Sequence, residues 1–561
     1  MPHFTEDNHT FQADAKAQPP SNDGRTRFPR ISRPIELMRS EYDVVVIGSG
    51  YGGGVAASRM ARANQTVCVL ELGKERWPGE YPSTLKDIMP QFHVSGGLQS
   101  DSNGDEWTEV GDATGLYHLI VGQGQNVFVG NGMSGRHLTV VDRFAYLSPG
   151  LGGTSLLNAN VFLRADENAL SMNHWPSEIR NDPTCLEKYY QRAESVLEPE
   201  PYPRDFPRLP KLDLLEKQAA IVGLEKNFYR VPQTTRFRDG PNATGVEMQT
   251  STLTGTDLTG LNDGSKSSTL VNYLSDAWNW GAEMFCECEV RFIKKDARGQ
   301  GYIVFFAWRG SKREKFREHF HRDLMWVRAR QCVFLGAGSL GTAEILLRSK
   351  QRGLSVSSRV GTGMSGNGDV LAFGCGINHE TSSIWPPANP TGPTITGIID
   401  CRDKPDPLDN FVIQEGAVPA PLAPIIRPIL GMRAGARYFR RLHDSLLTLG
   451  AEDEGGKQPT EQCDGLTGAG RGGRTQIYLA MCHDGNEGTL SLKDDKPSLR
   501  FSGARRREHV RSIEALLAEA TRAVGGAFEN SPLGNVLHSQ GVRLAPPFCS
   551  PPRSAFTANA Q

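Results

Sequence analysis

The sequence predicts an α/β fold in which parallel strands and helices alternate, with helices on both faces of a doubly wound sheet. Three observations predict it. A β-branched run at residues 43–47 ends in glycine, a glycine-rich turn and a helix-forming segment follow it, and a second strand-like run ends at Glu71. A strand, a helix and a second parallel strand in direct succession form a β-α-β unit, whose strands are buried on both faces.

The predicted elements follow in chain order. Residues 43–47 and 66–71 are apolar and β-branched, as expected of buried strands, and residues 53–63 between them combine small residues with helix formers. The same order recurs far along the chain, where a strand at 331–336 leads through a glycine turn into an amphipathic helix at 337–347. Residues 451–474 are polar and few of them are apolar, which predicts a long flexible loop.

The composition excludes some functions. A chain of 561 residues can form two or more domains with sizeable cores. Its 62 basic and 63 acidic side chains nearly balance, so no nucleic-acid partner is expected. The ten cysteines are scattered, which indicates reduced thiols. No metal site is expected, since a pair such as His319 and His321 is more typical of a polar strand.

The first forty residues are polar and rich in Pro, Asp, Asn and Arg, which predicts a disordered extension without the apolar core of a secretory signal. No run approaches the roughly 18 apolar residues that a membrane-spanning helix needs. We therefore expect a cytoplasmic protein, and peripheral contact with a membrane that carries a lipid substrate stays open.

The turn at residues 48–53, GSGYGG, matches the dinucleotide fingerprint G-x-G-x-x-G between a strand and a helix. Gly48 permits the tight turn, Gly50 allows the backbone to approach a pyrophosphate, and Gly53 allows close packing of helix on strand. The helix N-terminus supplies N–H donors and the positive end of its dipole. Glu71 would accept hydrogen bonds from a ribose, although a solvated carboxylate at a strand end is the alternative. The fingerprint alone does not separate FAD from NAD.

Further motifs occur in a fixed order downstream of the fingerprint. GLGGTSLLNAN spans residues 150–160, a Trp-Pro pair follows at 175–176, and Tyr189 and Tyr190 precede EPYP at 200–203. This set, from about residue 42 to about residue 540, resembles the glucose-methanol-choline (GMC) oxidoreductases, and within them the cholesterol-oxidase-like, fungal-type branch.

The resemblance implies FAD as the cofactor and hydride transfer from an alcohol to the flavin. Small residues at 152–161 would suit a segment that lies along the isoalloxazine, because backbone can then approach a flat ring closely. A glycine-rich connection without a ligand is the alternative. The residues that the resemblance assigns to FAD are Gly48, Gly50, Tyr51, Gly52, Gly53, Glu71, Gly152, Gly153, Thr154, Asn158, Ala159, Val161 and Val290.

The resemblance implies two further points about how FAD is bound. Relatives that attach FAD covalently use a histidine where this chain has Leu157, so the resemblance implies non-covalent FAD. Val290 matches the strand that lies beside the adenine, although as a sequence feature alone it is more typical of a core residue.

The segment FVIQEGAVPA at residues 411–420 resembles the family segment that carries the catalytic carboxylate of cholesterol oxidases. In that family the glutamate moves a proton on the steroid ring, and apolar surroundings would raise its pKa toward a useful range for a base. The resemblance therefore implies Glu415 as the catalytic residue, and a solvent-exposed carboxylate at a strand end is the alternative.

The chain departs from the family pattern in two places. Residues 133–149 interrupt a stretch that is nearly continuous in close relatives, and we hypothesise that this insertion is a retained intron. After residue 540 the family pattern would continue into His-Pro-Leu-Gly-Gly and a last flavin-contacting stretch with Asn-Pro, and the residues after 540 contain neither. We therefore expect an atypical, truncated C-terminus. His538 is a poor substitute for the missing histidine because Ser-Gln follows it.

The resemblance implies a Rossmann-like, FAD-binding domain and an antiparallel-sheet substrate-binding domain that covers the flavin. The expected division is 1–40 (disordered extension), 41–163, 247–374 and 482–540 (FAD-binding domain, its last part incomplete), 164–246 and 375–481 (substrate-binding domain), and 541–561 (atypical tail).

The function expected from the resemblance is oxidation of a secondary alcohol, either sterol-like or a secondary metabolite, with O2 as the electron acceptor. A dehydrogenase with another acceptor is one alternative. An inactive flavin-binding protein is the other, favoured for this chain by the missing histidine.

Overall fold

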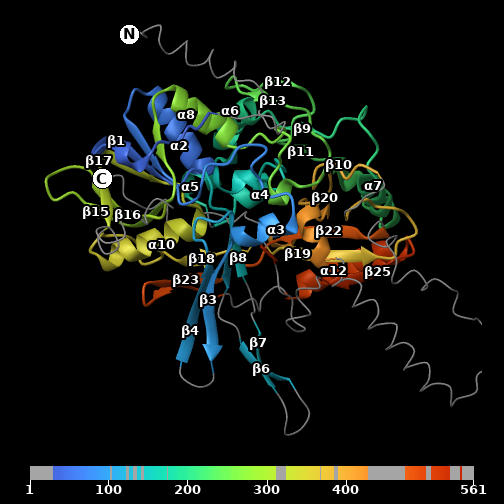
Figure 1. Cartoon of the computed structure of the whole chain (residues 1–561). Coiled ribbons are helices and arrows are strands. Elements are labelled where there is room, and N and C mark those ends of the chain that lie inside the picture. Colours follow the sequence, from blue (N-terminus) through green and yellow to red (C-terminus); the bar gives the residue numbers. More distant parts are fainter. Residues whose placement is uncertain are drawn as a thin grey trace, which may run out of the picture.

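The computed structural model describes residues 29–100, 104–121, 125–129, 136–140, 144–173, 175–310, 324–366, 368–384, 389–426, 474–500, 507–530 and 544–545. It is a mixed α/β structure with several sheets (Figure 1). Two six-stranded sheets form its two halves, and strands β3, β4, β6 and β7 extend from the body between them. The predicted loop at 451–474 and the residues His319, His321 and His538 lie outside the described residues.

The first sheet contains the elements predicted around the fingerprint. Its strands, in spatial order, are β14 (Glu283–Phe285), β2 (Val67–Leu70), β1 (Glu41–Ile47), β17 (Met325–Leu335), β16 (Tyr302–Trp308) and β15 (Cys288–Lys295). The first four are parallel, and β16 and β15 continue the sheet in antiparallel fashion. The predicted strands at 43–47, 66–71 and 331–336 are confirmed, and the third begins six residues earlier than expected.

Helices cover both faces of the first sheet. Helix α2 (Tyr51–Arg62) packs with η7 (Leu270–Leu274) and α8 (Ser275–Asn279) on one face, where its small residues meet Val44 and Val46. Helix α10 (Gly338–Gln351) lies on the other face, where Ile345 packs against Val45 and Ile47. The alternation of β1 side chains between the two clusters is what a buried parallel strand requires.

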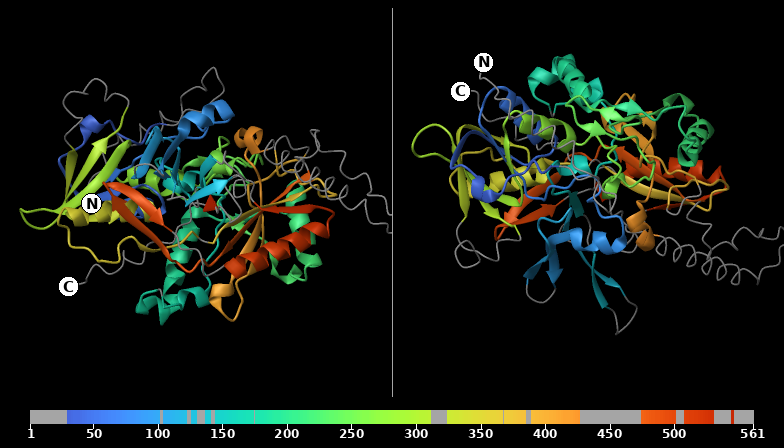
Figure 2. Two further views of the ribbon diagram at one scale, coloured as in Figure 1. Left: turned by 90° about the horizontal axis from the view of Figure 1, so that it is seen from below. Right: turned by 45° about the horizontal axis from the view of Figure 1, so that its top comes forward.

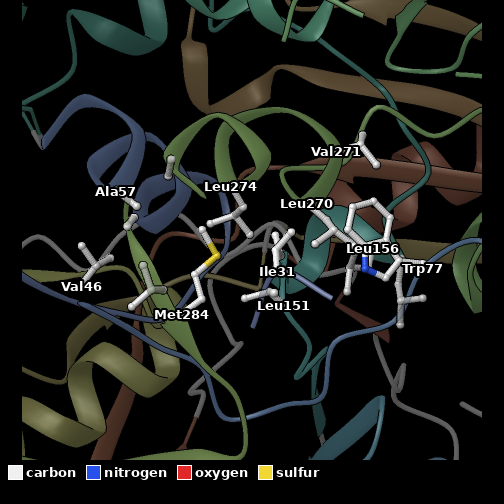
Figure 3. Packing of buried hydrophobic residues seen from close by; sticks show 14 of the residues in the cluster. Ile31, Val46, Ala57, Trp77, Leu151, Leu156, Leu270, Val271, Leu274 and Met284 are labelled. Atoms are coloured by element: carbon white, nitrogen blue, oxygen red, sulfur yellow. The ribbon is translucent and has the colours of Figure 1, made fainter. Parts of the chain in front are cut away.

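The segment before β1 corrects the expectation of disorder up to residue 40. Ile31 is 3% exposed within the first core cluster, and Figure 3 shows it beside Leu151. Arg33 and Arg39 both pair with the buried carboxylate of Glu283. Residues 29–40 therefore pack on the sheet, because an apolar side chain and two arginines supply contacts that the polar composition of the whole extension hides.

The second sheet is antiparallel throughout. Its strands, in spatial order, are β10 (Phe228–Arg230), β20 (Gly397–Cys401), β21 (Phe411–Gly416), β22 (Gln476–Cys482), β19 (Val370–Cys375) and β25 (Ala527–Asn530). Helices α7 (Pro210–Ile221) and α12 (Arg507–Arg522) cover one face, as Figure 2 shows for α12. The opposite face packs on residues that follow the glycine-rich segment.

Smaller elements connect these halves. They are η1 (Ile35–Leu37), α3 (Leu85–Ile88), η2 (Met89–Gln91), η3 (Gly153–Leu156), α4 (Glu167–Leu170), α5 (Ser177–Arg180), η4 (Pro183–Leu186), α6 (Glu187–Leu197), β9 (Glu200–Pro201), η5 (Glu225–Asn227), β11 (Pro232–Gln233), β12 (Gly240–Pro241), β13 (Glu247–Met248), η6 (Asp257–Thr259), β18 (Thr362–Met364), η9 (Pro407–Asp409), η10 (Ala420–Leu422), β23 (Gly488–Lys493) and β24 (Lys496–Arg500).

The predicted division of the chain differs from the sheets at two places. Strand β19 begins at Val370, five residues before the expected boundary, and β25 lies within 482–540 although it pairs with β19 in the second sheet. Strands β23 and β24 of that same range pack instead against α10 of the first half. The range 482–540 thus contributes to both halves.

The insertion at 133–149 contains two short strands. Strand β7 (Arg136–Val140) pairs with β6 (Gln125–Val129). Strand β8 (Phe144–Leu147) pairs with β5 (Tyr117–Val121) and with β26 (Leu544–Ala545) in the sheet that also holds β3 (Phe92–Ser100) and β4 (Gly104–Gly111). The segment therefore adds to two sheets next to the glycine-rich segment.

The retained-intron hypothesis predicts the composition of the messenger RNA. We expect most transcripts to lack the codons for residues 133–149, because the family motif is continuous without them. Sequencing of full-length transcripts measures this directly. A majority of transcripts that contain the segment would contradict the hypothesis.

Among the described residues, no helix has the length and apolar character needed to cross a bilayer.

Candidate functional site

The glycine turn between β1 and α2 is packed too tightly for side chains at two positions. Gly48 has a φ of +85°, and a Cβ there would lie 2.5 Å from the Gly336 carbonyl oxygen. A Cβ at Gly53 would lie 1.9 Å from the Gly48 carbonyl oxygen. These two glycines therefore hold helix against strand, as the fingerprint predicts.

The two middle glycines face open space. A Cβ at Gly52 would have no atom within 4 Å, and one at Gly50 would come no closer than 3.9 Å to any neighbour. Gly50 caps α2 without a side-chain hydrogen bond, and the first turn of the helix has no acidic residue. The N–H groups of this turn have no acceptor within the helix, so the position fits an anion such as a pyrophosphate.

The fingerprint and the glycine-rich segment 150–161 lie side by side. The backbone N–H of Gly152 donates to Oγ of Ser49 at 2.9 Å. A Cβ at Gly153 would lie 2.8 Å from the Cα of Gly50. The side-chain amide of Asn158 donates to the hydroxyl of Tyr51 at 2.7 Å. Burial raises the pKa of the Tyr51 hydroxyl to about 12, so it stays protonated near neutral pH.

Glu71 joins these segments. Its Oε2 accepts from the backbone N–H and the hydroxyl of Ser49 at 3.0 and 2.6 Å, and its Oε1 accepts from the N–H groups of Gly73 and Gly150 at 2.9 and 3.2 Å. Burial raises the pKa of its carboxyl group, and these hydrogen bonds oppose the rise without cancelling it. The four acceptor positions of the carboxylate are filled. A ribose hydroxyl would therefore replace one of these donors rather than add to them.

The segment 152–161 presents small and polar residues between the two halves. Gly152 has a φ of +120°, which an L side chain rarely adopts, and η3 follows it. Asn158 and Ala159 are buried, whereas Thr154 is half-buried. Ala159 and Val161 pack against the second sheet. The segment thus connects the fingerprint on one side with the second sheet on the other.

A buried lysine that sequence reasoning missed supports this segment. The ammonium of Lys266 donates to the carbonyl oxygen of Asn158 at 2.5 Å and to the side-chain oxygen of Asn160. The amide of Asn160 in turn donates to Asp257 at 2.6 Å. Burial lowers the pKa of Lys266 to about 8, and Asp257 and Asp263 oppose this shift. No motif surrounds Lys266 in the sequence, so only the fold reveals its position.

The lowered pKa of Lys266 predicts how stability depends on pH. Its ordinary pKa is 10.5, so between pH 8 and 10.5 the unfolded chain binds more protons than the folded one. The free energy of unfolding should therefore rise over this window, by up to about 3 kcal/mol from this group. Below pH 8 the group adds no slope. Urea unfolding at several pH values measures the rise.

The Lys266→Met variant is the control for this prediction. It should lack the part of the rise between pH 8 and 10.5 that Lys266 contributes, while other titrating groups act equally in both proteins. An identical pH slope in wild type and variant would contradict the assignment.

Val290 and Glu415 lie apart from these contacts. Val290 is 7% exposed in the core cluster that includes Leu70 and Ile47. Glu415 is fully buried, and its Oε1 accepts from Nζ of Lys211 on α7 at 2.8 Å. The backbone N–H groups of Thr396 and Gly397 also donate to this carboxylate.

The contacts of Glu415 do not support its predicted role as a base near the flavin segment, which stays a prediction. Phe411, Ile413 and Glu415 point to the face that α7 and α12 cover, whereas Val412 packs with Ala159 on the opposite face. Side chains alternate along a strand, so the preceding residue, Gln414, shares the face of Val412. Glu415 holds a buried ion pair with Lys211 instead.

The arrangement of a parallel sheet, a glycine turn and an uncapped helix N-terminus is typical of dinucleotide-binding α/β proteins. Residues 124–365 match the family model described as GMC oxidoreductase. Over these residues the chain is similar to the GMC oxidoreductase family, whose members are in general FAD flavoproteins.

Similar proteins agree with this assignment. The chain is 26% identical to a cholesterol oxidase of Acinetobacter baumannii over 336 residues, which cover 56% of this chain and 51% of that protein. It is 24% identical to a cholesterol oxidase of Mycobacterium tuberculosis over 340 residues, or 58% and 51% of the two chains. Over 79 residues it is 38% identical to the long-chain-alcohol oxidase FAO4B of Arabidopsis thaliana, or 14% and 11%. The chain spans about half the length of the cholesterol oxidases it matches.

Proposed function

We propose that this chain is an FAD-dependent oxidoreductase that oxidises a secondary alcohol with an apolar carbon skeleton, with O2 as the electron acceptor. The observation that carries the proposal is the contact between the open N-terminus of α2 and the segment 152–161, within a chain similar to the GMC family. The similar proteins are named as oxidases of cholesterol and of long-chain alcohols, which supports an apolar alcohol and O2.

The residues present fit FAD. The N–H groups of Tyr51 and Gly52 would hold the pyrophosphate beside Gly50, where the structure leaves space for it. Glu71 would face the ribose, and Val290 would lie toward the adenine. The segment 152–161 would lie along the isoalloxazine through Gly152, Gly153, Thr154, Asn158, Ala159 and Val161. When bound, FAD supplies the acceptor for the hydride that leaves the alcohol carbon.

The protein supplies position and polarity to this chemistry. Lys266 donates to the backbone carbonyl oxygen of Asn158, and Tyr51 accepts from the side-chain amide of Asn158, so that both hold this residue at the centre of the segment. The apolar face of the second sheet, which packs on Ala159 and Val161, would exclude water from the reacting carbon. Leu157 is fully buried and offers no nucleophile, so the proposal is non-covalent FAD.

Two measurements test the proposal. Denaturation of the purified yellow protein should release flavin into solution, since the binding is non-covalent. Cholesterol, cyclohexanol and 2-dodecanol, which are secondary alcohols, should then be added without oxygen, and at least one should bleach the flavin. On admission of air, hydrogen peroxide should form in proportion to alcohol consumed. Dye reduction without peroxide would indicate a dehydrogenase, and flavin that no alcohol bleaches would indicate a flavin-binding protein without this activity.

A further inference from the structure

The face of β21 that points toward the segment 152–161 carries a polar side chain, Gln414. This residue is 3% exposed, and its side-chain amide makes no hydrogen bond to any described residue. Its neighbours across the sheet are Ile398 on β20 and Leu479 on β22, in direct register. Since side chains directly opposite in antiparallel strands share a face, Gln414 lies between two apolar side chains.

A second amide lies in the same region. Gln233 is fully buried, and neither its oxygen nor its nitrogen has a hydrogen-bond partner. Its backbone forms an isolated antiparallel β-bridge with the backbone of Val161, and it lies two residues from Val231. Both valines pack in the cluster of Ala159 and Val412. Leaving such a group without a partner costs about 1–3 kcal/mol. Gln414 and the unpartnered Gln233 thus both adjoin this apolar cluster, which indicates a face that takes up a ligand.

We propose that Gln414 is the residue that positions the oxygen of the substrate, through a hydrogen bond between its side-chain amide and the hydroxyl group. This inference rests on the proposed function for the identity of the reaction. The apolar neighbours of Gln414 define the rest of the ligand as an uncharged carbon skeleton. An amide can donate and accept hydrogen bonds but does not titrate, so the face suits a neutral alcohol and its ketone.

The face contrasts with the covered side of the same strand. Glu415, the adjacent residue, has its carboxylate filled by Lys211 and by backbone donors. A proton-transferring carboxylate is therefore absent from the described residues of β21 on the side of the segment 152–161. Gln414 thus binds and orients the alcohol, and it moves no proton on the carbon skeleton of the substrate.

The test compares alcohols with the matching alkanes in the FAD-loaded protein. Gln414→Leu should weaken binding of cyclohexanol and 2-dodecanol about tenfold, and raise KM by the same factor for any of them that is oxidised. Binding of cyclohexane and dodecane, measured by calorimetry, should change less than about twofold, because only the hydroxyl contact is lost. An equal change for alcohol and alkane would overturn the proposal.

Two further variants separate positioning from structure. Gln476→Leu removes a buried amide from the covered face of the same sheet, where it donates to the Lys211 carbonyl oxygen at 3.0 Å, and should leave alcohol affinity unchanged. Gln414→Glu should bind alcohol like wild type at low pH and lose affinity as its buried carboxyl group ionises. A pH-independent Gln414→Glu variant, or loss of alcohol affinity in Gln476→Leu, would count against the proposal.

The outcomes distinguish this inference from the proposed function. One outcome is that no alcohol bleaches the flavin of the wild-type protein while Gln414→Leu selectively loses alcohol binding. This outcome would contradict the proposed reaction and support the oxygen site. Bleaching that is unchanged in Gln414→Leu, at the same KM, would support the reaction and overturn the oxygen site. Wild-type protein that binds none of the alcohols overturns both.

Discussion

Gly50→Val should abolish FAD retention while the protein still folds. The backbone of Gly50 has a φ of −64°, which any residue adopts, and a Cβ there meets no atom closer than 3.9 Å. The methyl groups of valine would instead occupy the space at the N-terminus of α2. Loss of two charge-assisted hydrogen bonds to the pyrophosphate predicts an affinity at least about a hundredfold lower. Flavin content after gel filtration measures the effect.

Gly53→Ala is the matched control within the same turn. Its Cβ would lie 1.9 Å from a backbone oxygen, so this variant should lose the fold together with the flavin. The two variants thus distinguish loss of pyrophosphate binding at Gly50 from loss of the packing contact at Gly53. A Gly50→Val protein that purifies with full flavin occupancy would contradict the assignment of the fingerprint to FAD binding.

Glu415→Gln should lower the free energy of unfolding by about 3–5 kcal/mol, because it leaves the ammonium of Lys211 buried without a counter-charge. Both side chains are completely buried. The double variant Lys211→Met with Glu415→Gln should be more stable than the sum of the two single changes predicts, since it removes both charges. Urea unfolding of the four proteins measures this coupling.

An exposed ion pair at the start of α7, the helix that carries Lys211, is the control. Arg208 pairs with Asp213 at 2.8 Å while its side chain is 87% exposed, so Arg208→Ala should cost less than about 1 kcal/mol. Glu415→Gln with wild-type stability would mean that the buried pair is not structural, and would return Glu415 to consideration as a base.

The parts of the fold that could be predicted from the sequence are those that local patterns determine. The strands around the fingerprint, the helix after it and the later strand and helix pair were all found, because β-branched runs and glycine turns mark them within a few residues. The pairing of β10 with β20 and of β19 with β25 joins segments far apart in the chain. No local pattern indicates such pairs, so the predicted boundaries do not follow the limits of the sheets there.

The candidate site shows the same limit at the level of single residues. The motif at 411–420 was located, but the face of each side chain follows from the register of β21 with its neighbours, and a shift of one residue exchanges Glu415 for Gln414. Lys266 and Gln233 belong to no motif. Their importance comes from what the fold places around them: carbonyl and amide oxygens for Lys266 and an apolar cluster for Gln233.

The flavin absorbance of the purified protein during anaerobic addition of an alcohol shows whether the protein is an FAD-dependent alcohol oxidase. We expect a yellow protein with about one flavin for each chain, bleached by an apolar secondary alcohol and restored by air with formation of peroxide. A protein that binds no flavin after reconstitution with FAD, or whose flavin stays oxidised with every alcohol tried, would contradict it.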